Sequence, residues 1–352
     1  MQEKKQALRP QDRDRYSRQI LFPPLGEAGQ GALLSSSAVL VGCGALGTVI
    51  ANLLVRSGLG RLRIIDRDFV EPSNLQRQTL FEEEDARQSL PKAAAAERRL
   101  HAINSSISVE GIVADLTSEN VRELLSGFPL ILDGTDNFET RLLINDASIA
   151  LGIPWIYAAA VGSYGVTMPI RPRVTACLAC MLESAESSSS FDADETCDTA
   201  GILNSAASVV ASLASTEAIK FLAGKSDFSA SRLLSCDVWT GRFQSIRVER
   251  NPECRACAHR QLAYLEGSAQ PHITMCGRDS VQIHERHRHL DLGSLGRRLS
   301  SASVSSVRAN EFLLRFHVAP YEMTVFADGR AIIKGTKDPA VARSLYARFV
   351  GA

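Results

Sequence analysis

The stretch from Ala38 to Phe81 constrains the fold of this chain more than any other. It begins with an apolar, β-branched run that is typical of a buried parallel strand. A glycine turn, Gly42-Cys43-Gly44-Ala45-Leu46-Gly47, follows at once, and residues 48–56 have helical spacing. Strand, glycine turn and helix in this order are the context in which a G-x-G-x-x-G pattern predicts a nucleotide site.

The glycine turn can bring backbone N–H groups close to a phosphate, and the N-terminus of the next helix adds positive partial charge. A second predicted strand, 62–65, ends in Asp66, and an acid at this distance from the glycines commonly binds a ribose hydroxyl. On these features alone an ordinary NAD site is favoured. Within the turn, the expected nucleotide contacts are Gly42, Gly44, Ala45 and Gly47.

The residues after Asp66 are more polar and cationic than an NAD site requires. Arg77 and Lys92 could both face a triphosphate, Arg77 through its planar guanidinium group and Lys92 through its compact ammonium group. The candidate nucleotide contacts of this region are Ser73, Asn74, Leu75, Gln76, Arg77 and Lys92.

Further acids follow the fourth predicted strand, residues 130–132. Ligands of an open α/β sheet bind beyond the carboxyl ends of its strands. Asp136, with its neighbour Asn137, lies further into the loop than Asp133 and is the better catalytic candidate. Asp136 could also cap the helix that starts near Glu139, and the two roles are compatible. Asp133 is interpreted as structural.

Four of the eight cysteines form two Cys-x-x-Cys pairs, Cys177/Cys180 and Cys254/Cys257. Four thiolates at two knuckles match the tetrahedral coordination of a structural zinc ion. The pairs are 73 residues apart (181–253), far more than in a compact zinc ribbon, so the spacing alone supports the site only in part. A redox dithiol is the alternative for either pair, but it would not explain two.

A Ser- and acid-rich stretch, 183–195, is interpreted as a mobile loop that leads into Cys197. Polar surroundings and a place ahead of a helix favour a reactive thiol at Cys197. The alternative is a spare buried thiol, and Cys43 and Cys236 fit that description.

Taken together, these motifs resemble those of the ThiF/MoeB family, the bacterial relatives of the ubiquitin-activating enzymes. The resemblance covers about residues 15–257, and the ordered set is far more specific than any single motif. One departure is Ala45, which stands at the third glycine of the family's usual turn, GxGGLG, where a methyl group could crowd a phosphate. The matching pieces are Arg15 to Ile20, the glycine turn, Asp66, Ser73 to Gln78, Pro91-Lys92, Asp133 to Asn137 and the two cysteine pairs.

The resemblance implies an ATP-dependent adenylyltransferase. Its substrate would be the C-terminal glycine of a ubiquitin-like sulfur-carrier protein, ThiS- or MoaD-like, in thiamin, molybdopterin or related biosynthesis. ATP, Mg²⁺ and Zn²⁺ are the cofactors it implies. Arg77 and Lys92 would neutralise phosphate charge, Asp136 would hold Mg²⁺, and Asp66 would bind the ribose.

The resemblance also implies partners. Arg18 would reach the nucleotide of the partner subunit in a homodimer, although a solvated surface charge explains it equally well. In some members of the family a cysteine in the segment of Cys197 forms a covalent link to the carrier, and in others it is dispensable. A cysteine desulfurase or another sulfur donor is a further possible partner.

Composition argues against two classes of partner. The chain has 39 basic and 39 acidic residues, so no global basic field recruits nucleic acid or anionic lipid. No apolar run reaches the ~20 residues that span a bilayer, and the polar N-terminus has no signal-like core. We therefore expect no nucleic acid, no membrane and a cytoplasmic protein.

The predicted fold class is α/β: a Rossmann-like, doubly wound, mainly parallel sheet with an antiparallel extension, plus a small C-terminal α+β domain. The ATP-binding domain with its zinc site is assigned to residues 1–265, of which 1–14 are expected to fray. The accessory domain is assigned to 266–352, and we expect it to tune binding of the carrier or the sulfur donor.

Other functions stay open beside the adenylyltransferase. A related enzyme could adenylate a peptide or a tRNA-base carboxylate, and the zero net charge argues mildly against tRNA. An NAD-dependent dehydrogenase would differ in the nucleotide that it binds. A non-catalytic scaffold could hold a ubiquitin-like tail without exchanging pyrophosphate into ATP.

Overall fold

The structure is a computed structural model that describes residues 8–186, 201–230, 232–268, 280–284, 290–300, 304–310, 312–327, 329–336 and 338–351. The chain divides into two compact units, Met1–Gln270 and Pro271–Ala352. Each unit has a β-sheet of its own.

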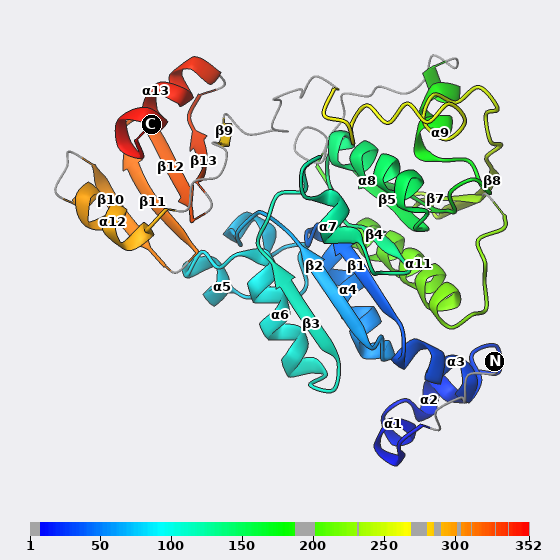
Figure 1. The fold of residues 1–352 in the computed structure, drawn as a ribbon. Helices are drawn as coiled ribbons and strands as arrows, with labels where there is room; N and C mark the ends of the chain where they lie inside the picture. The colour runs from blue at the N-terminus through cyan, green and yellow to red at the C-terminus, as the bar shows by residue number, and fades with distance from the viewer. Residues whose placement is uncertain are drawn as a thin grey trace. The chain divides into compact units, whose positions relative to one another are not determined.

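The first unit is built on one eight-stranded sheet with the order β3-β2-β1-β4-β5-β6-β7-β8 (Figure 1). The strands from β3 to β5 pair in parallel, and β6, β7 and β8 continue the sheet antiparallel. The predicted mainly parallel sheet with an antiparallel extension is confirmed. The strands are β1 Ser37–Val41, β2 Arg61–Ile65, β3 Ser108–Ile112, β4 Ile131–Asp133, β5 Trp155–Val161, β6 Tyr164–Ile170, β7 Arg232–Asp237 and β8 Arg242–Arg247.

Helices cover both faces of this sheet, as a doubly wound fold requires. Alternate residues of β1 divide between two apolar cores, because Leu40 joins the core of α4, α6 and α11, while Val39 and Val41 join the core of α7, α8 and α9. No helix in the described part of the chain is long and apolar enough to cross a lipid bilayer. The helices are α4 Ala45–Ser57, 3₁₀ helix η1 Pro72–Asn74, α5 Glu83–Arg87, α6 Lys92–Ile103, α7 Val121–Leu125, α8 Phe138–Leu151, α9 Leu178–Glu186 and α11 Asn204–Leu222.

Three short helices precede β1: α1 Pro10–Arg15, α2 Ser17–Ile20 and α3 Gly26–Leu34. The expectation that residues 1–14 fray is therefore wrong from Pro10 onward. The segment is held by the far end of α4, where Gln19 Nε2 donates to the carbonyl oxygen of Ser57 (2.9 Å). The expected loop at 183–195 is also wrong at its start, because α9 extends to residue 186.

The second unit is a five-stranded antiparallel sheet with the order β10-β11-β12-β13-β9, and two helices share its apolar core (Figure 1). This confirms the predicted small α+β fold. The edge strand β10 was not predicted, because its sequence, SSVRA, has little apolar alternation. The elements are β9 Ser280–His284, α12 Leu292–Ser300, β10 Ser305–Ala309, β11 Leu313–Val318, β12 Tyr321–Phe326, β13 Arg330–Lys334 and α13 Pro339–Phe349.

Three glycines bring the backbones of β1, β4 and α4 into direct contact in the first unit. A Cβ atom on Gly47 would lie 2.1 Å from the carbonyl oxygen of Gly42, and one on Gly134 would lie 2.4 Å from the same oxygen. Gly42 itself has a φ of +87°, which side chains rarely adopt. The contact is therefore possible only without side chains.

Gly47→Ala should destabilise the protein, because its methyl group would meet backbone that cannot yield. Overpacking of this kind typically costs ~1–3 kcal/mol, and we expect the upper end of that range. Gly31→Ala in α3 is the matched control, since its Cβ would have no neighbour closer than 3.9 Å and alanine favours a helix by up to ~1 kcal/mol. Chemical denaturation measures both, and equal stabilities of the two variants would contradict the packing argument.

Candidate functional site

The carboxyl ends of β1, β2 and β4 define the candidate site. β1 lies between β2 and β4 in the sheet, and the connection that leaves β1 runs to β2 on one side while the connection that leaves β4 runs to β5 on the other. Such a topological switch point is where open α/β sheets bind their ligands. The glycine turn follows β1, Asp66 follows β2, and Asp133 ends β4.

The glycine turn has one glycine that the protein itself does not crowd. Gly44 is the N-cap residue of α4, and a Cβ there would have no neighbour nearer than 3.9 Å. Gly42 and Gly47 serve backbone packing, whereas Gly44 leaves free space. Ala45 is the first residue of α4, where backbone N–H groups have no partner within the helix. The turn thus combines an open surface with unsatisfied donors, which suits an anion.

Asp66 is buried and holds the turn in place. Its Oδ2 accepts the backbone N–H of Cys43 (2.6 Å), and its Oδ1 accepts that of Asp68 (2.7 Å). Burial raises the pKa of Asp66 to about 6, although Lys92 acts in the opposite direction. Each carboxylate oxygen keeps a second lone pair, so a ribose hydroxyl can still bind the same carboxylate.

Lys92, at the start of α6, is a buried cation with only 6% of its surface exposed. Its Nζ lies 3.0 Å from Asp68 Oδ2. Burial alone would lower the pKa of Lys92, but Asp68, Asp66 and Asp136 together raise it above the ordinary value. Three carboxylates from the ends of two strands therefore surround one ammonium group.

The charge cluster consists of Lys92, Asp66, Asp68 and Asp136, together with Arg67 and Asp115. Asp68 and Arg67 were not singled out from the sequence. Asp68 accepts Lys92, and Arg67 lies beside it with Nη1 3.0 Å from Asp115 Oδ2. Burial opposes protonation of Arg67, yet Asp115 and Asp68 raise its pKa overall. The available signal was the Asp-x-Asp spacing directly after β2, which places Asp66 and Asp68 at the edge of the sheet.

The segment with Arg77 forms a compact turn after η1. Asn74 is buried, and its Oδ1 accepts the backbone N–H of Glu71 (3.0 Å), so its side chain shapes the turn. Arg77 Nη1 donates to the carbonyl oxygen of Ser73 (2.9 Å). The carbonyl oxygen of Gln76 accepts Asn204 Nδ2 (3.2 Å), which ties the turn to the start of α11. Leu75 packs against the core, and Arg77 is partly exposed.

Two acids at the end of β4 and in the loop after it, Asp133 and Asp136, have different surroundings. Asp133 is fully buried, and Arg141 Nε donates to its Oδ2 (3.2 Å), which makes it structural as interpreted. Asn137 is the N-cap of α8, because its Oδ1 accepts the backbone N–H of Thr140 (2.8 Å). The alternative that Asp136 caps the helix is therefore wrong. Asp136 is exposed and is near enough to Lys92 to raise its pKa.

The four predicted zinc ligands meet in the fold although 73 residues separate the pairs. Their four sulfur atoms lie within 4.8 Å of one another, and all four residues are buried. The Sγ–Sγ distances are 3.8 Å for Cys177–Cys180, 3.7 Å for Cys177–Cys254 and 3.5 Å for Cys180–Cys257. These are too long for a disulfide bond, at ~2.05 Å. Tetrahedral coordination with Zn–S of ~2.3 Å gives S–S edges of about 3.8 Å, so the donor set fits zinc.

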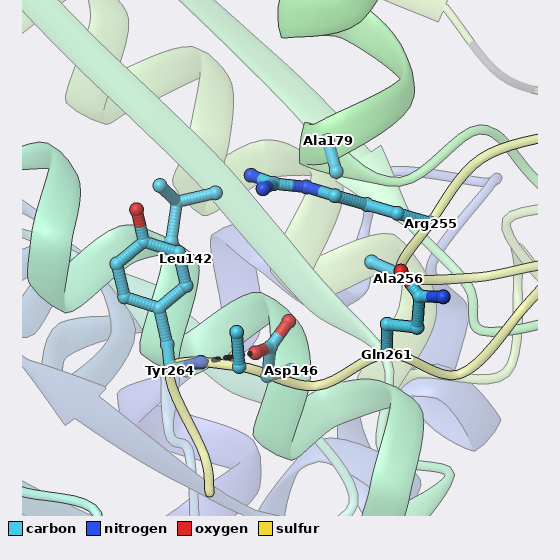
Figure 2. Close-up of a pocket in the computed structure, with 8 residues that line it drawn as sticks. Leu142, Asp146, Ala179, Arg255, Ala256, Gln261 and Tyr264 are labelled. Atoms are coloured by element: carbon cyan, nitrogen blue, oxygen red, sulfur yellow. Dashed lines mark hydrogen bonds between the residues drawn. The ribbon is translucent and has the colours of Figure 1, made fainter. Parts of the chain in front are cut away.

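Helix α8 links these cysteine knuckles to the nucleotide side of the sheet. Asn145 Oδ1 accepts the backbone N–H of Leu178 (2.9 Å), and Asp146 Oδ2 accepts that of Tyr264 (3.0 Å), as Figure 2 shows. Burial raises the pKa of Asp146 to about 6. The cavity between Asp146 and Arg255 has a volume of about 10 Å³, enough for about one water molecule. This region is therefore built for structure and has no room for a substrate.

Arg18 does not join the cluster of its own chain. Arg18 is on α2, and α2 contacts Ser57 at the far end of the 13-residue helix α4. A helix of this length spans ~20 Å, so Arg18 lies well away from the glycine turn of its own chain. Cys197 lies outside the described residues. Cys43 and Cys236 are buried, as expected for spare buried thiols, and burial raises the pKa of both.

Comparison with known proteins covers nearly the whole chain. The sulfur carrier protein ThiS adenylyltransferase of Bacillus subtilis (strain 168) is 43% identical over 341 residues, 96% of this chain and 99% of the relative. The enzyme of the same name from Escherichia coli (strain K12) is 36% identical over 249 residues, 70% of this chain and 96% of the relative.

Solved structures agree on the first unit. The crystal structure of E. coli MccB with succinimide superposes with a TM-score of 0.60 and 25% identity, covering 69% of this chain and 74% of that one. The model of the ThiF family matches residues 16–256. These residues contain the glycine turn, the charge cluster and three of the four clustered cysteines, and the chain belongs to the ThiF family.

Proposed function

We propose that this chain is an ATP-dependent adenylyltransferase that activates a ubiquitin-like sulfur-carrier protein of the ThiS type. The observation that carries the proposal is the set of carboxylates and cations at the carboxyl edge of β1, β2 and β4, beside an uncrowded glycine turn. The relative that spans 96% of the chain is a ThiS adenylyltransferase, which supports this carrier over a MoaD-like one.

The reaction joins two anions. The C-terminal carboxylate of the carrier attacks the α-phosphorus of ATP, the bond to the β-phosphate breaks, and an acyl-adenylate and pyrophosphate result. Because carboxylate and triphosphate repel each other, the protein contributes mainly by positioning them and by neutralising charge. Exchange of labelled pyrophosphate into ATP, dependent on the carrier, reports this step alone.

Within this chain, Lys92 and Arg77 are the cations that would neutralise the phosphates. Lys92 stays charged because Asp68 and its neighbours raise its pKa, and its Nζ can pass from Asp68 to a phosphate oxygen without leaving the site. The open side of Gly44 and the first N–H groups of α4 would receive phosphate oxygens. Asp66, fixed by two backbone donors, would bind the ribose.

Asp136 is the residue that would hold Mg²⁺. Mg²⁺ at nucleotide sites is bound through one or two carboxylates together with substrate phosphates, and Asp136 is an exposed carboxylate beside Lys92. When bound there, the ion supplies charge neutralisation at the phosphates.

A homodimer would complete the site. The helix that contains Arg18 contacts the far end of α4, which is ~20 Å long, so Arg18 would act on the nucleotide of a partner subunit. Leu21 and Phe22, directly after α2, are 68% and 60% exposed, and large exposed apolar side chains of this kind favour a protein interface.

Cys197 is proposed to take part after adenylation, in the transfer of the activated acyl group to sulfur. The chain that follows it is anchored at the site, because Gly162 N–H donates to Gly201 O (2.9 Å) and Leu203 N–H donates to Gly162 O (2.8 Å). Cys197 is four positions before Gly201, which limits the distance between their Cα atoms to ~14 Å. A sulfur donor such as a cysteine desulfurase would act at this later stage.

Asp136→Ala should separate nucleotide binding from chemistry. The turn, Lys92 and Asp66 remain, so ATP should still bind, whereas carrier-dependent pyrophosphate exchange should fall by ~10²-fold or more, as for loss of a preorganised charge contact. Cys197→Ser is the comparison variant, which should keep exchange and impair only the later transfer. Near-normal exchange by Asp136→Ala would remove Asp136 from the metal site.

Mixed dimers test the role of Arg18 in the partner's site. Arg18→Ala and Lys92→Ala homodimers should each be nearly inactive in exchange. A mixed dimer of one chain of each kind has one site with an intact Lys92 and an intact Arg18 from its partner, so it should recover about half of the wild-type rate. An inactive mixed dimer would show that Arg18 acts within its own chain or not at all.

Zinc should be present at one equivalent per chain, held by Cys177, Cys180, Cys254 and Cys257. Cys177→Ser should lose the metal and lower the thermal midpoint more than it changes ATP affinity, because metal binding contributes to folding. Cys236→Ala, a buried thiol outside the cluster, should keep the metal. Elemental analysis decides this, and zinc-free protein from a chelator-free preparation would exclude a structural zinc site.

A further inference from the structure

The hydroxyl of Thr48 joins the glycine turn to the segment that carries Arg77. Thr48 is in the first turns of α4 and is fully buried. Its Oγ1 donates to the carbonyl oxygen of Gly44 (2.8 Å) and accepts the backbone N–H of Thr79 (3.3 Å). One side chain thus contacts the uncrowded residue of the turn and a residue two positions after Arg77.

The segment that Thr48 holds includes Gln78, whose side-chain amide lies beside the glycine turn. Gln78 is 3% exposed, and its Oε1 has no hydrogen-bond partner among the described residues. Its Nε2 lies 3.9 Å from the position that a Cβ of Gly44 would take. A buried amide oxygen that is left unsatisfied is costly, and only a donor such as a ligand hydroxyl could satisfy it. The amide nitrogen beside Gly44 can donate to a ligand oxygen such as that of a phosphate.

The hydroxyl of Thr48 can donate only one hydrogen bond, and this fixes the direction of both hydrogen bonds that it makes. A threonine hydroxyl has one proton and two lone pairs, so once it donates to Gly44 O it must accept from Thr79. Threonine is a poor helix former whose back-bonding to residue i−4 slightly destabilises a helix. The local cost in α4 is offset by the tertiary bond to Thr79.

We propose that Thr48 is a positioning residue that fixes Arg77 and Gln78 relative to the glycine turn, so that both sides of the phosphate-binding surface are set before ATP binds. The proposal rests on the proposed function, since it assigns Arg77 to the triphosphate. Thr48 touches no phosphate itself and acts through the backbone at Thr79. A shift of about 1 Å in such a group costs up to ~10² in rate.

A double-mutant cycle on ATP affinity tests the proposal without the carrier. Thr48→Val keeps the shape and removes the hydroxyl, and it should raise the dissociation constant of ATP by about 10-fold, the loss of ~1.4 kcal/mol that a hydrogen bond of this kind can supply. Thr48→Ser keeps the hydroxyl and should stay within about twofold of wild type. In an Arg77→Ala/Gln78→Ala background, Thr48→Val should add less than about twofold, because its effect passes through these two side chains.

The outcomes are distinguishable. Equal losses from Thr48→Val in both backgrounds, or equal losses from Val and Ser, would overturn the proposal in favour of plain packing. Thr48→Ala is the second hydroxyl-free variant if Thr48→Val does not fold. If neither folds while Thr48→Ser does, the hydroxyl is a folding element and the proposal is wrong. A wild-type protein that binds ATP but exchanges no pyrophosphate would overturn the carrier function and leave the cycle on Thr48 intact, and one that binds no ATP would overturn both.

Discussion

The close contact of Gly42, Gly47 and Gly134 is the constraint on which the site depends. Without side chains, the ends of β1 and β4 and the first turn of α4 approach to distances that any Cβ would prevent. The approach fixes the N-terminus of α4 against the switch point of the sheet, which aims its free N–H groups at one place. Gly44, which has no such contact, is then the residue that a ligand can approach.

Carboxylates keep Lys92 charged before a ligand arrives. Lys92 is buried with Asp68 at 3.0 Å and with further carboxylates that raise its pKa, and a buried ammonium without them would give up its proton. In the proposed function the same carboxylates would compete with phosphate for the cation, so binding of ATP would exchange Asp68 for phosphate oxygens. Lys92 would have a charged, hydrogen-bonded partner both before and after this exchange, so the free-energy cost of the exchange would be low.

The sequence predicted the sheet, the glycine turn and the cysteine pairs because each has a short-range signal. It did not predict α1 or β10, whose residues lack apolar periodicity and are held by contacts with other parts of the chain, such as that of Arg15 with Asn104. Asp68 was missed although the Asp-x-Asp spacing offered a local signal. Arg67, Thr48 and Gln78 were missed for a related reason. Their importance comes from which atoms they meet across the fold, and no local pattern encodes that. The role of the C-terminal unit stays a prediction.

Helix α8 shows why a distant metal cluster can matter to a nucleotide site. At its N-terminus Asn137 caps the helix, and Asp136 precedes the cap. About two turns later, Asn145 and Asp146 accept backbone N–H groups next to the first cysteine pair and after the second. The cysteine cluster therefore fixes the middle of a rigid helix whose start positions Asp136. Because the two cysteine pairs come from segments 73 residues apart, metal binding would close this frame around α8, and a structural ion would then help to place the loop proposed to hold Mg²⁺.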